Sequence, residues 1–152
     1  MRARLFWLIS RTAVFLYRRF PIFGPIPGSV AVVRRDNHFL VIERSDGYGL
    51  SLPGGLARPF ENAEDALHRE VREETGLTIT SAELKYDFVT SYLYPTHTRV
   101  FETTVEGEIR GSWEGRPRFV SLQELEQEIM PTQRPILRYL NGHNPAVCSA
   151  NK

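Results

Sequence analysis

Three glutamates at helical spacing, Glu70, Glu73 and Glu74, lie in the segment REVREETG. Residues three and four positions apart are neighbours on one face of a helix, so these carboxylates would fall within an arc of roughly 100°. Like charges at this spacing destabilise a helix unless something neutralises them. A hard divalent cation does so, and Mg²⁺ takes oxygen ligands while keeping several of its waters. The spacing therefore indicates a metal site.

The alternative is an acidic helix face that meets only solvent. The helical wheel argues against it, because the side that carries Glu70 and Glu74 also carries four apolar residues: Ala63, Ala66, Leu67 and Val71. The remainder of the helix is polar and is the predicted solvent side: Glu64, Asp65, His68, Arg69 and Arg72. We therefore expect the acids to face the body of the protein, where unpaired carboxylates are costly.

The helix that positions these acids is predicted over residues 62–75. Asn62 is a cap candidate, the first turn is acidic, and Gly76 is a typical C-terminal stop. Before it, β-rich residues 30–34 and 39–43 flank Asp36-Asn37 and predict a hairpin. A short extended piece is predicted over residues 50–52.

The second half of the chain predicts more strands and a second helix. Residues 77–88 and 89–108 favour strands, and residues 113–118 a loop before a short strand at 119–120. Ser121 caps a predicted helix that runs to Met130, with Glu124 in the capping-box position, and residues 135–140 add a last helical turn or two. Strands interrupted by two helices predict an α/β sandwich with helices on both faces of a mixed sheet.

The segment GLARPFENAEDALHREVREETGL resembles the Nudix box: Gly, five residues, Glu, seven residues, Arg-Glu-aliphatic, one residue, Glu-Glu, one residue, Gly-aliphatic. All nine defined positions are met: Gly55, Glu61, Arg69, Glu70, Val71, Glu73, Glu74, Gly76 and Leu77. The resemblance extends over about residues 29–140. It implies a Nudix-type α/β/α sandwich with a mixed β-sheet.

The resemblance also implies an activity. Nudix hydrolases cleave the pyrophosphate linkage of a nucleoside diphosphate joined to another moiety, by water attack on phosphorus. Glu70, Glu73 and Glu74 would hold Mg²⁺, or Mn²⁺ in its place, with help from the Gly55 carbonyl. Arg69 and Glu61, the remaining catalytic-site residues, would form an ion pair that fixes the loop against the helix. The alternative is a Nudix domain that binds nucleotides without turning them over.

Two positions depart from the pattern of many members. Arg58 stands where they carry Glu, and Phe60 where they carry Gly. Arg58 replaces an outer metal ligand with a positive charge, which offers a contact to substrate phosphate. The general base is a box glutamate or an acid of a later loop, for which Glu114 is the candidate; the alternative is a turn residue before Gly115.

Substrate choice rests on weaker signals. Gln133 resembles the base-reading Asn of members that act on oxidised guanine nucleotides, with a helix-capping or solvated Gln as the alternative. Tyr94 lies 17 residues beyond Leu77, a spacing similar to that of dinucleoside polyphosphate hydrolases. The substrate stays open among nucleoside triphosphates, including oxidised ones, dinucleoside polyphosphates, ADP-ribose and nucleotide sugars.

Bulk properties fit one soluble domain with a small nucleotide-type substrate. The chain has 152 residues and a formal net charge of +1, which argues against an extended nucleic-acid partner. Its single cysteine, Cys148, cannot form an internal disulfide, so we expect a cytoplasmic protein. We assign the Nudix domain to residues 24–141 and a disordered tail to residues 142–152.

Residues 1–23 form a predicted N-terminal amphipathic helix. Arg4, Arg11 and Arg18 recur every seven residues and share one face. Arg11 splits the apolar run, so neither a membrane span nor a secretory signal fits. We expect the helix to pack on its own domain or on a homodimer partner, with anchoring at a membrane surface as the alternative.

Overall fold

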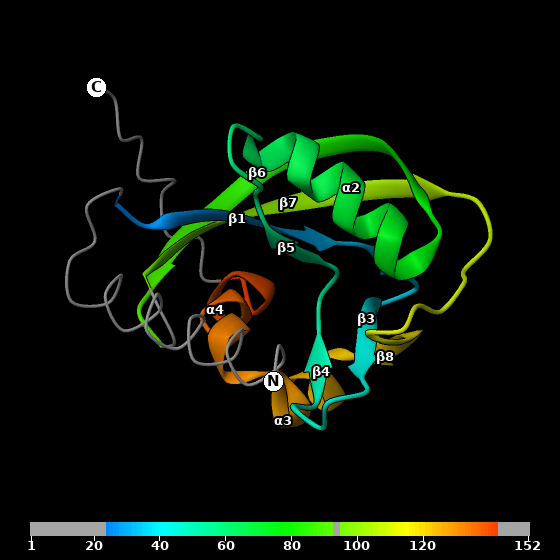
Figure 1. The fold of residues 1–152 in the computed structure, drawn as a ribbon. Coiled ribbons are helices and arrows are strands. Elements are labelled where there is room, and N and C mark those ends of the chain that lie inside the picture. Colours follow the sequence, from blue (N-terminus) through cyan, green and yellow to red (C-terminus); the bar gives the residue numbers. More distant parts are fainter. Residues whose placement is uncertain (1–23, 93–94, 143–152) are drawn as a thin grey trace, which may run out of the picture.

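A computed structural model describes residues 24–92 and 95–142 of the chain (Figure 1). The strands are β1 Ile26–Val32, β2 Arg34–Arg35, β3 His38–Arg44, β4 Leu50–Ser51, β5 Gly54–Leu56, β6 Thr78–Thr90, β7 Thr96–Glu106 and β8 Gly115–Ser121. The helices are α2 Ala63–Thr75, α3 Leu122–Glu128, the short 3-10 helix η1 Pro131–Gln133 and α4 Ile136–Leu140. The predicted N-terminal helix and nearly all of the predicted tail lie outside the described residues.

The predicted mixed sheet is present, and a second sheet accompanies it. The first sheet has the order β5-β1-β7-β6, in which β1 and β7 are parallel and the other pairs antiparallel. The second has the order β2-β3-β4, and β8 pairs with β3. The predicted hairpin exists only between β2 and β3, around Asp36 and Asn37, both at positive φ, as a two-residue turn with matching twist requires. The prediction was wrong to place residues 30–32 in it, because β1 belongs to the first sheet.

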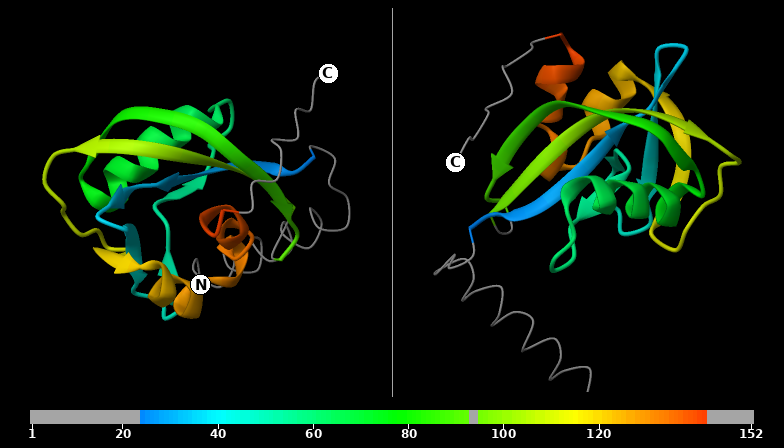
Figure 2. Two further views of the ribbon diagram at one scale, coloured as in Figure 1. Left: turned by 180° about the vertical axis from the view of Figure 1, so that it is seen from behind. Right: turned by 90° about the horizontal axis from the view of Figure 1, so that it is seen from above.

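Strand β1 is buried on both faces and separates two cores. Val30 and Val32 belong to the core that also contains α3 and α4 residues, whereas Ala31 and Val33 belong to the core under α2. Successive side chains of a strand point to opposite faces, which explains this division. The right-hand view of Figure 2 shows α2 on one side of β1, β7 and β6, and α4 on the other. The predicted arrangement of helices on both faces is therefore confirmed.

Helix α2 begins and ends as its sequence predicts. The Asn62 side chain accepts a hydrogen bond from the Asp65 backbone N–H, and Gly76 ends the helix at φ 74° with its N–H donated to the Arg72 carbonyl. Both features satisfy backbone groups that a helix end leaves unpaired. The two ends of α2 are therefore stabilised by these caps, without contacts from Glu70, Glu73 or Glu74.

The later elements differ from prediction mainly in length. Strand β8 starts at Gly115, inside the predicted loop, because residues 115–121 all pair with β3. Helix α3 ends at Glu128, two residues early, and its cap is Ser121 as predicted. Within the part of the chain that the structure describes, no helix is long and apolar enough to span a membrane.

We predict that Gly54→Ala severely destabilises the protein. Gly54 has φ 145°, and a Cβ there would lie 2.2 Å from the Ser29 carbonyl oxygen of β1. Backbone strain and overpacking together cost about 2–5 kcal/mol, measurable by urea unfolding. Gly47→Ala is the matched control, because φ is 81° but nothing lies within 4 Å, so its cost is about 1–2 kcal/mol. Equal losses in the two variants would contradict the assigned contact.

Candidate active site

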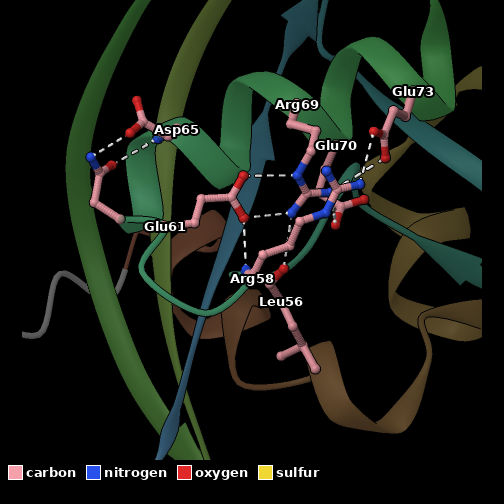
Figure 3. Close-up of polar contacts among 8 residues, drawn as sticks. Leu56, Arg58, Glu61, Asp65, Arg69, Glu70 and Glu73 are labelled. Carbon is pink, nitrogen blue, oxygen red and sulfur yellow. Dashed lines mark hydrogen bonds and ion pairs between the residues drawn. The ribbon is translucent and has the colours of Figure 1, made fainter.

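The Arg69 guanidinium joins helix α2 to the loop that follows β5 (Figure 3). Its Nε and Nη2 each donate to a Glu61 carboxylate oxygen at 2.8 Å, Nη2 also donates to the Leu56 carbonyl at 3.1 Å, and Nη1 donates to Glu70 Oε1 at 2.6 Å. Glu61 in turn accepts from the Arg58 backbone N–H at 2.7 Å. One side chain therefore fixes the course of the loop before the helix.

The charges of this pair are secure at physiological pH. Hydrogen bonds from Arg69, then the Arg58 backbone N–H, lower the pKa of Glu61 to about 2. The hydrogen bonds that Arg69 donates to Glu61 raise the pKa of Arg69 above its ordinary value. Bidentate pairing of a guanidinium with a carboxylate is a strong, directional contact. The loop is thus held by a pair that stays ionised down to strongly acidic pH.

The three box glutamates differ in exposure. Glu74 is 5% exposed, and the side chains of Glu70 and Glu73 are 16% and 52% exposed. The expectation that the acids face inward holds for Glu74 and Glu70 and is wrong for Glu73. Glu73 lies at the edge of the site, where it accepts from Arg58 and Arg69 at 3.3 Å each.

Glu74 is a buried carboxyl surrounded by like charge. Its Oε2 accepts from the Gly54 backbone N–H at 2.9 Å. Burial, followed by the nearby charges of Glu70 and Glu114, raises the pKa of Glu74 to about 8, against the opposing effects of the Gly54 hydrogen bond and Arg44. An ionised carboxylate in this position needs a positive partner beyond those that the protein supplies.

The Glu70 carboxylate lies directly against the Gly55 backbone. A Cβ at Gly55 would be 2.6 Å from the Glu70 carboxyl carbon and Oε1, so a side chain at position 55 would displace the carboxylate. The backbone of Gly54 and Gly55 therefore touches two of the three glutamates. This close approach explains why β5 begins with two glycines.

These donors fit a hard divalent cation. Among the residues described, no three His, Cys, Asp or Glu side chains lie together as a ready metal cluster, and arginines form ion pairs with Glu70 and Glu73. The donor set is nevertheless all oxygen, and its buried member is Glu74, whose pKa is raised by burial and then by the nearby charges of Glu70 and Glu114. Oxygen donors of this kind suit Mg²⁺ or Mn²⁺.

Two residues from other strands approach the box. Glu114 precedes β8, and its carbonyl accepts from the backbone N–H and Oγ of Ser45, both at 3.0 Å. Its charge raises the pKa of Glu74, whereas that of Arg44 lowers it. Arg44, which forms an ion pair with Asp46, was missed from the sequence. Its signal is a charged residue at the end of the buried strand β3, beside a glycine turn.

The three predicted substrate contacts lie in different surroundings. The Arg58 side chain is 63% exposed, at the solvent edge of the site. Gln133 is buried; its Oε1 accepts from the Leu52 N–H at 2.7 Å and its Nε2 donates to the Leu52 carbonyl at 3.1 Å. The Gln133 amide thus joins η1 to the segment before the box, instead of capping a helix or facing solvent. Tyr94 lies outside the described residues.

A cavity of about 300 Å³ opens beside the box. Its wall includes the backbone of Gly54 and Gly55, Arg44, strands β1 and β7, and η1. Because Gly54 and Gly55 also touch Glu74 and Glu70, the cavity and the carboxylates share one boundary. A ligand in the cavity would therefore carry its nearest atoms to the acids.

Comparison with known proteins shows the family. The NUDIX domain model matches residues 25–140, and the chain belongs to this family. It is 43% identical over 53 residues to a "MutT-like protein" of Streptomyces ambofaciens, and 39% identical over 64 residues to the "Putative 8-oxo-dGTP diphosphatase YtkD" of Bacillus subtilis (strain 168). These stretches cover 35% and 42% of the chain, and only 34% and 39% of those relatives.

Solved structures agree over a longer stretch. A MutT NUDIX hydrolase from Burkholderia pseudomallei superposes with a TM-score of 0.67 at 25% identity, covering 76% of this chain and 97% of that one. A MutT protein from Methanosarcina mazei Go1 gives 0.67 at 26% identity, covering 80% and 97%.

We predict that the metal-free protein loses stability as the pH rises from about 4.5 to 8. The folded state keeps Glu74 protonated up to about pH 8 because its pKa is raised from 4.5, so the folded state binds more protons than the unfolded state in this window. At about 1.4 kcal/mol per pKa unit, the loss is on the order of a few kcal/mol. Urea unfolding in EDTA at several pH values measures it.

The variant Glu74→Gln should flatten this pH dependence, because glutamine does not titrate. Glu64→Gln, an exposed position on the same helix, is the control and should retain the wild-type slope. Parallel pH profiles for Glu74→Gln and the wild type would show that Glu74 does not cause the effect.

Proposed function

We propose that this chain is a Mg²⁺-dependent pyrophosphohydrolase, with Mn²⁺ as an alternative metal, that acts on a nucleoside diphosphate linked to another moiety. The observation that carries the proposal is Glu74: a buried carboxyl beside Glu70 and Glu114, in contact with the backbone that walls an open cavity. A bound divalent ion would screen the diphosphate charge, polarise its oxygens and lower the pKa of bound water.

The chain's own residues have distinct proposed roles. Glu70, Glu73 and Glu74 would hold the metal with the Gly55 carbonyl, and this requires Glu70 and Glu73 to exchange their arginine contacts for the cation. Arg69 and Glu61 would keep the loop in place during that exchange, because their bidentate pair uses none of the oxygen atoms proposed to bind the metal.

The reaction is a single displacement at phosphorus. The water oxygen forms a bond to phosphorus, and the bond from that phosphorus to the bridging oxygen breaks. We assign the water proton to Glu114, which lies close enough to influence both Glu74 and Arg44. Arg44 and Arg58 would donate to the phosphate oxygens, Arg44 from the cavity wall and Arg58 from the solvent edge.

The relatives' names suggest where to begin a substrate search. One relative is named for 8-oxo-dGTP, and the similarity supports including that nucleotide with dGTP, ADP-ribose, dinucleoside polyphosphates and nucleotide sugars. We also propose a cytoplasmic location, consistent with a nucleotide substrate. A screen of these compounds with Mg²⁺ or Mn²⁺, read out by product chromatography, tests the proposal.

We predict that Glu74→Gln and Glu73→Gln each reduce kcat by more than about a hundredfold, the upper end for residues that merely support a ligand. Each change keeps the side-chain shape but removes a negative metal donor. Product release is measured with Mg²⁺ at fixed substrate, and Glu64→Gln is the control. Normal turnover in either variant would refute the proposed role of the substituted glutamate. If the folded wild type turns over none of the compounds, a nucleotide-binding domain without catalysis is the remaining function.

We predict that Arg44→Gln raises KM by about tenfold or more, as expected for loss of a hydrogen bond from a charged donor. The substitution removes the one positive side chain among the described residues of the cavity wall. Steady-state kinetics measures it against Arg138→Gln, an exposed position on α4. An unchanged KM would place the phosphates away from Arg44.

A further inference from the structure

The cavity beside the box has a fixed shape. One side is the face of the first sheet that carries Gly28, Val30 and Thr98, and the opposite side is η1 with Met130 and Thr132. The paired hydrogen bonds between Gln133 and the Leu52 backbone fix the position of η1 opposite the sheet. A cavity held in this way selects its ligand with little rearrangement.

Hydroxyl groups dominate the polar chemistry of this wall. Thr98 and Thr132 contribute hydroxyls that have no hydrogen-bond partner among the described residues. Thr90 and Thr96 also line it, and their hydroxyls contact each other at 2.9 Å, which leaves further donor or acceptor capacity on both. Each hydroxyl both donates and accepts, so the wall matches a ligand that does the same.

Features that read a nucleobase are missing from the described part of the wall. It contains no aromatic ring for stacking, and no acid. The Gln133 amide, whose donor and acceptor could pair with a purine edge, is already bonded on both sides to Leu52. Recognition of a flat base commonly uses stacking and a free amide or acid. The described wall offers neither.

Gly28 lets the backbone of β5 approach β1 closely at the cavity wall. It is a buried residue inside β1, and a Cβ there would lie 3.3 Å from the Gly55 carbonyl oxygen, 3.5 Å from a Leu56 methyl and 3.6 Å from the Thr98 Oγ1. A side chain at position 28 would therefore press on the Gly55 carbonyl and cover the Thr98 hydroxyl, which the glycine leaves open to the cavity. A glycine inside a strand commonly marks close approach of a ligand or another backbone.

From these features we infer that the cavity receives a sugar ring, so that the substrate is a nucleotide sugar, with the diphosphate at Gly55 and the sugar hydroxyls on Thr98 and Thr132. The inference rests on the proposed hydrolysis of a diphosphate. The hydroxyls of an uncharged sugar ring can form hydrogen bonds with the Thr98 and Thr132 hydroxyls. The apolar C–H face of the ring can contact Val30, Leu56 and Met130.

The test compares Thr98→Val with the wild type on ADP-ribose and UDP-glucose, and on dGTP and 8-oxo-dGTP, with Mg²⁺. Valine keeps the shape of threonine and removes the hydroxyl. We expect the wild type to prefer the nucleotide sugars, and Thr98→Val to raise their KM about three- to tenfold, the loss of one neutral hydrogen bond. The KM for either triphosphate should change less than twofold.

Thr78→Val, an exposed threonine at the start of β6, is the matched control and should leave all four KM values unchanged. Ribose 5-phosphate should also inhibit competitively at lower concentration than a nucleoside monophosphate, and this inhibition should weaken in Thr98→Val. Preference for 8-oxo-dGTP, or equal effects of Thr98→Val on both substrate classes, overturns the inference while leaving diphosphate hydrolysis intact. Failure to cleave any compound overturns both proposals.

Discussion

The bidentate contact between Arg69 and Glu61 supports the rest of the site. It joins the second turn of α2 to a loop that contains no regular structure, and the same guanidinium reaches the Leu56 carbonyl at the end of β5. The loop, the strand end and the helix are thus fixed by one planar group. This contact keeps the backbone of Gly54 and Gly55 against Glu74 and Glu70, although the two glycines have no side chains that could pack and fix it. The order of the backbone at the carboxylates depends on a pair that lies outside the metal donors.

Glu73 and Glu74 differ in how deeply their carboxyl groups are buried. Glu73 remains in solvent, where its two ion pairs are weak and exchangeable. Glu74 sits in a position where ionisation is costly without a cation, because burial and like charges act in the same direction. Under the proposed function, a single helix turn would combine one exposed metal ligand, Glu73, with one buried ligand, Glu74, whose ionisation would depend on the cation. The group whose ionisation is least stable in the metal-free protein is therefore the one that a bound cation would stabilise.

Local sequence signals predicted the elements well where chemistry is local. Asn62 and Gly76 set the ends of α2, and Ser121 the start of α3, because caps involve residues only a few positions apart. Strand β8 and the split of the hairpin were mispredicted because pairing partners far along the chain determine them. The same reason hides Arg44, because a wheel or a motif places residues of one element, whereas the approach of Arg44 to Glu74 arises from the packing of β3. Glu114 was a candidate only through the resemblance to the family.

The double burial of β1 limits how this chain can change in length. Its odd and even side chains belong to different cores, so insertion of one residue before Gly28 would send each later side chain into the wrong core. It would also move Gly28 from its place over the cavity and shift the register with β5, which carries the backbone of the site. We therefore expect length variation to be tolerated in the exposed turns, such as the one around Gly47, and not in this strand. The register of β1 fixes how the two cores are aligned with each other.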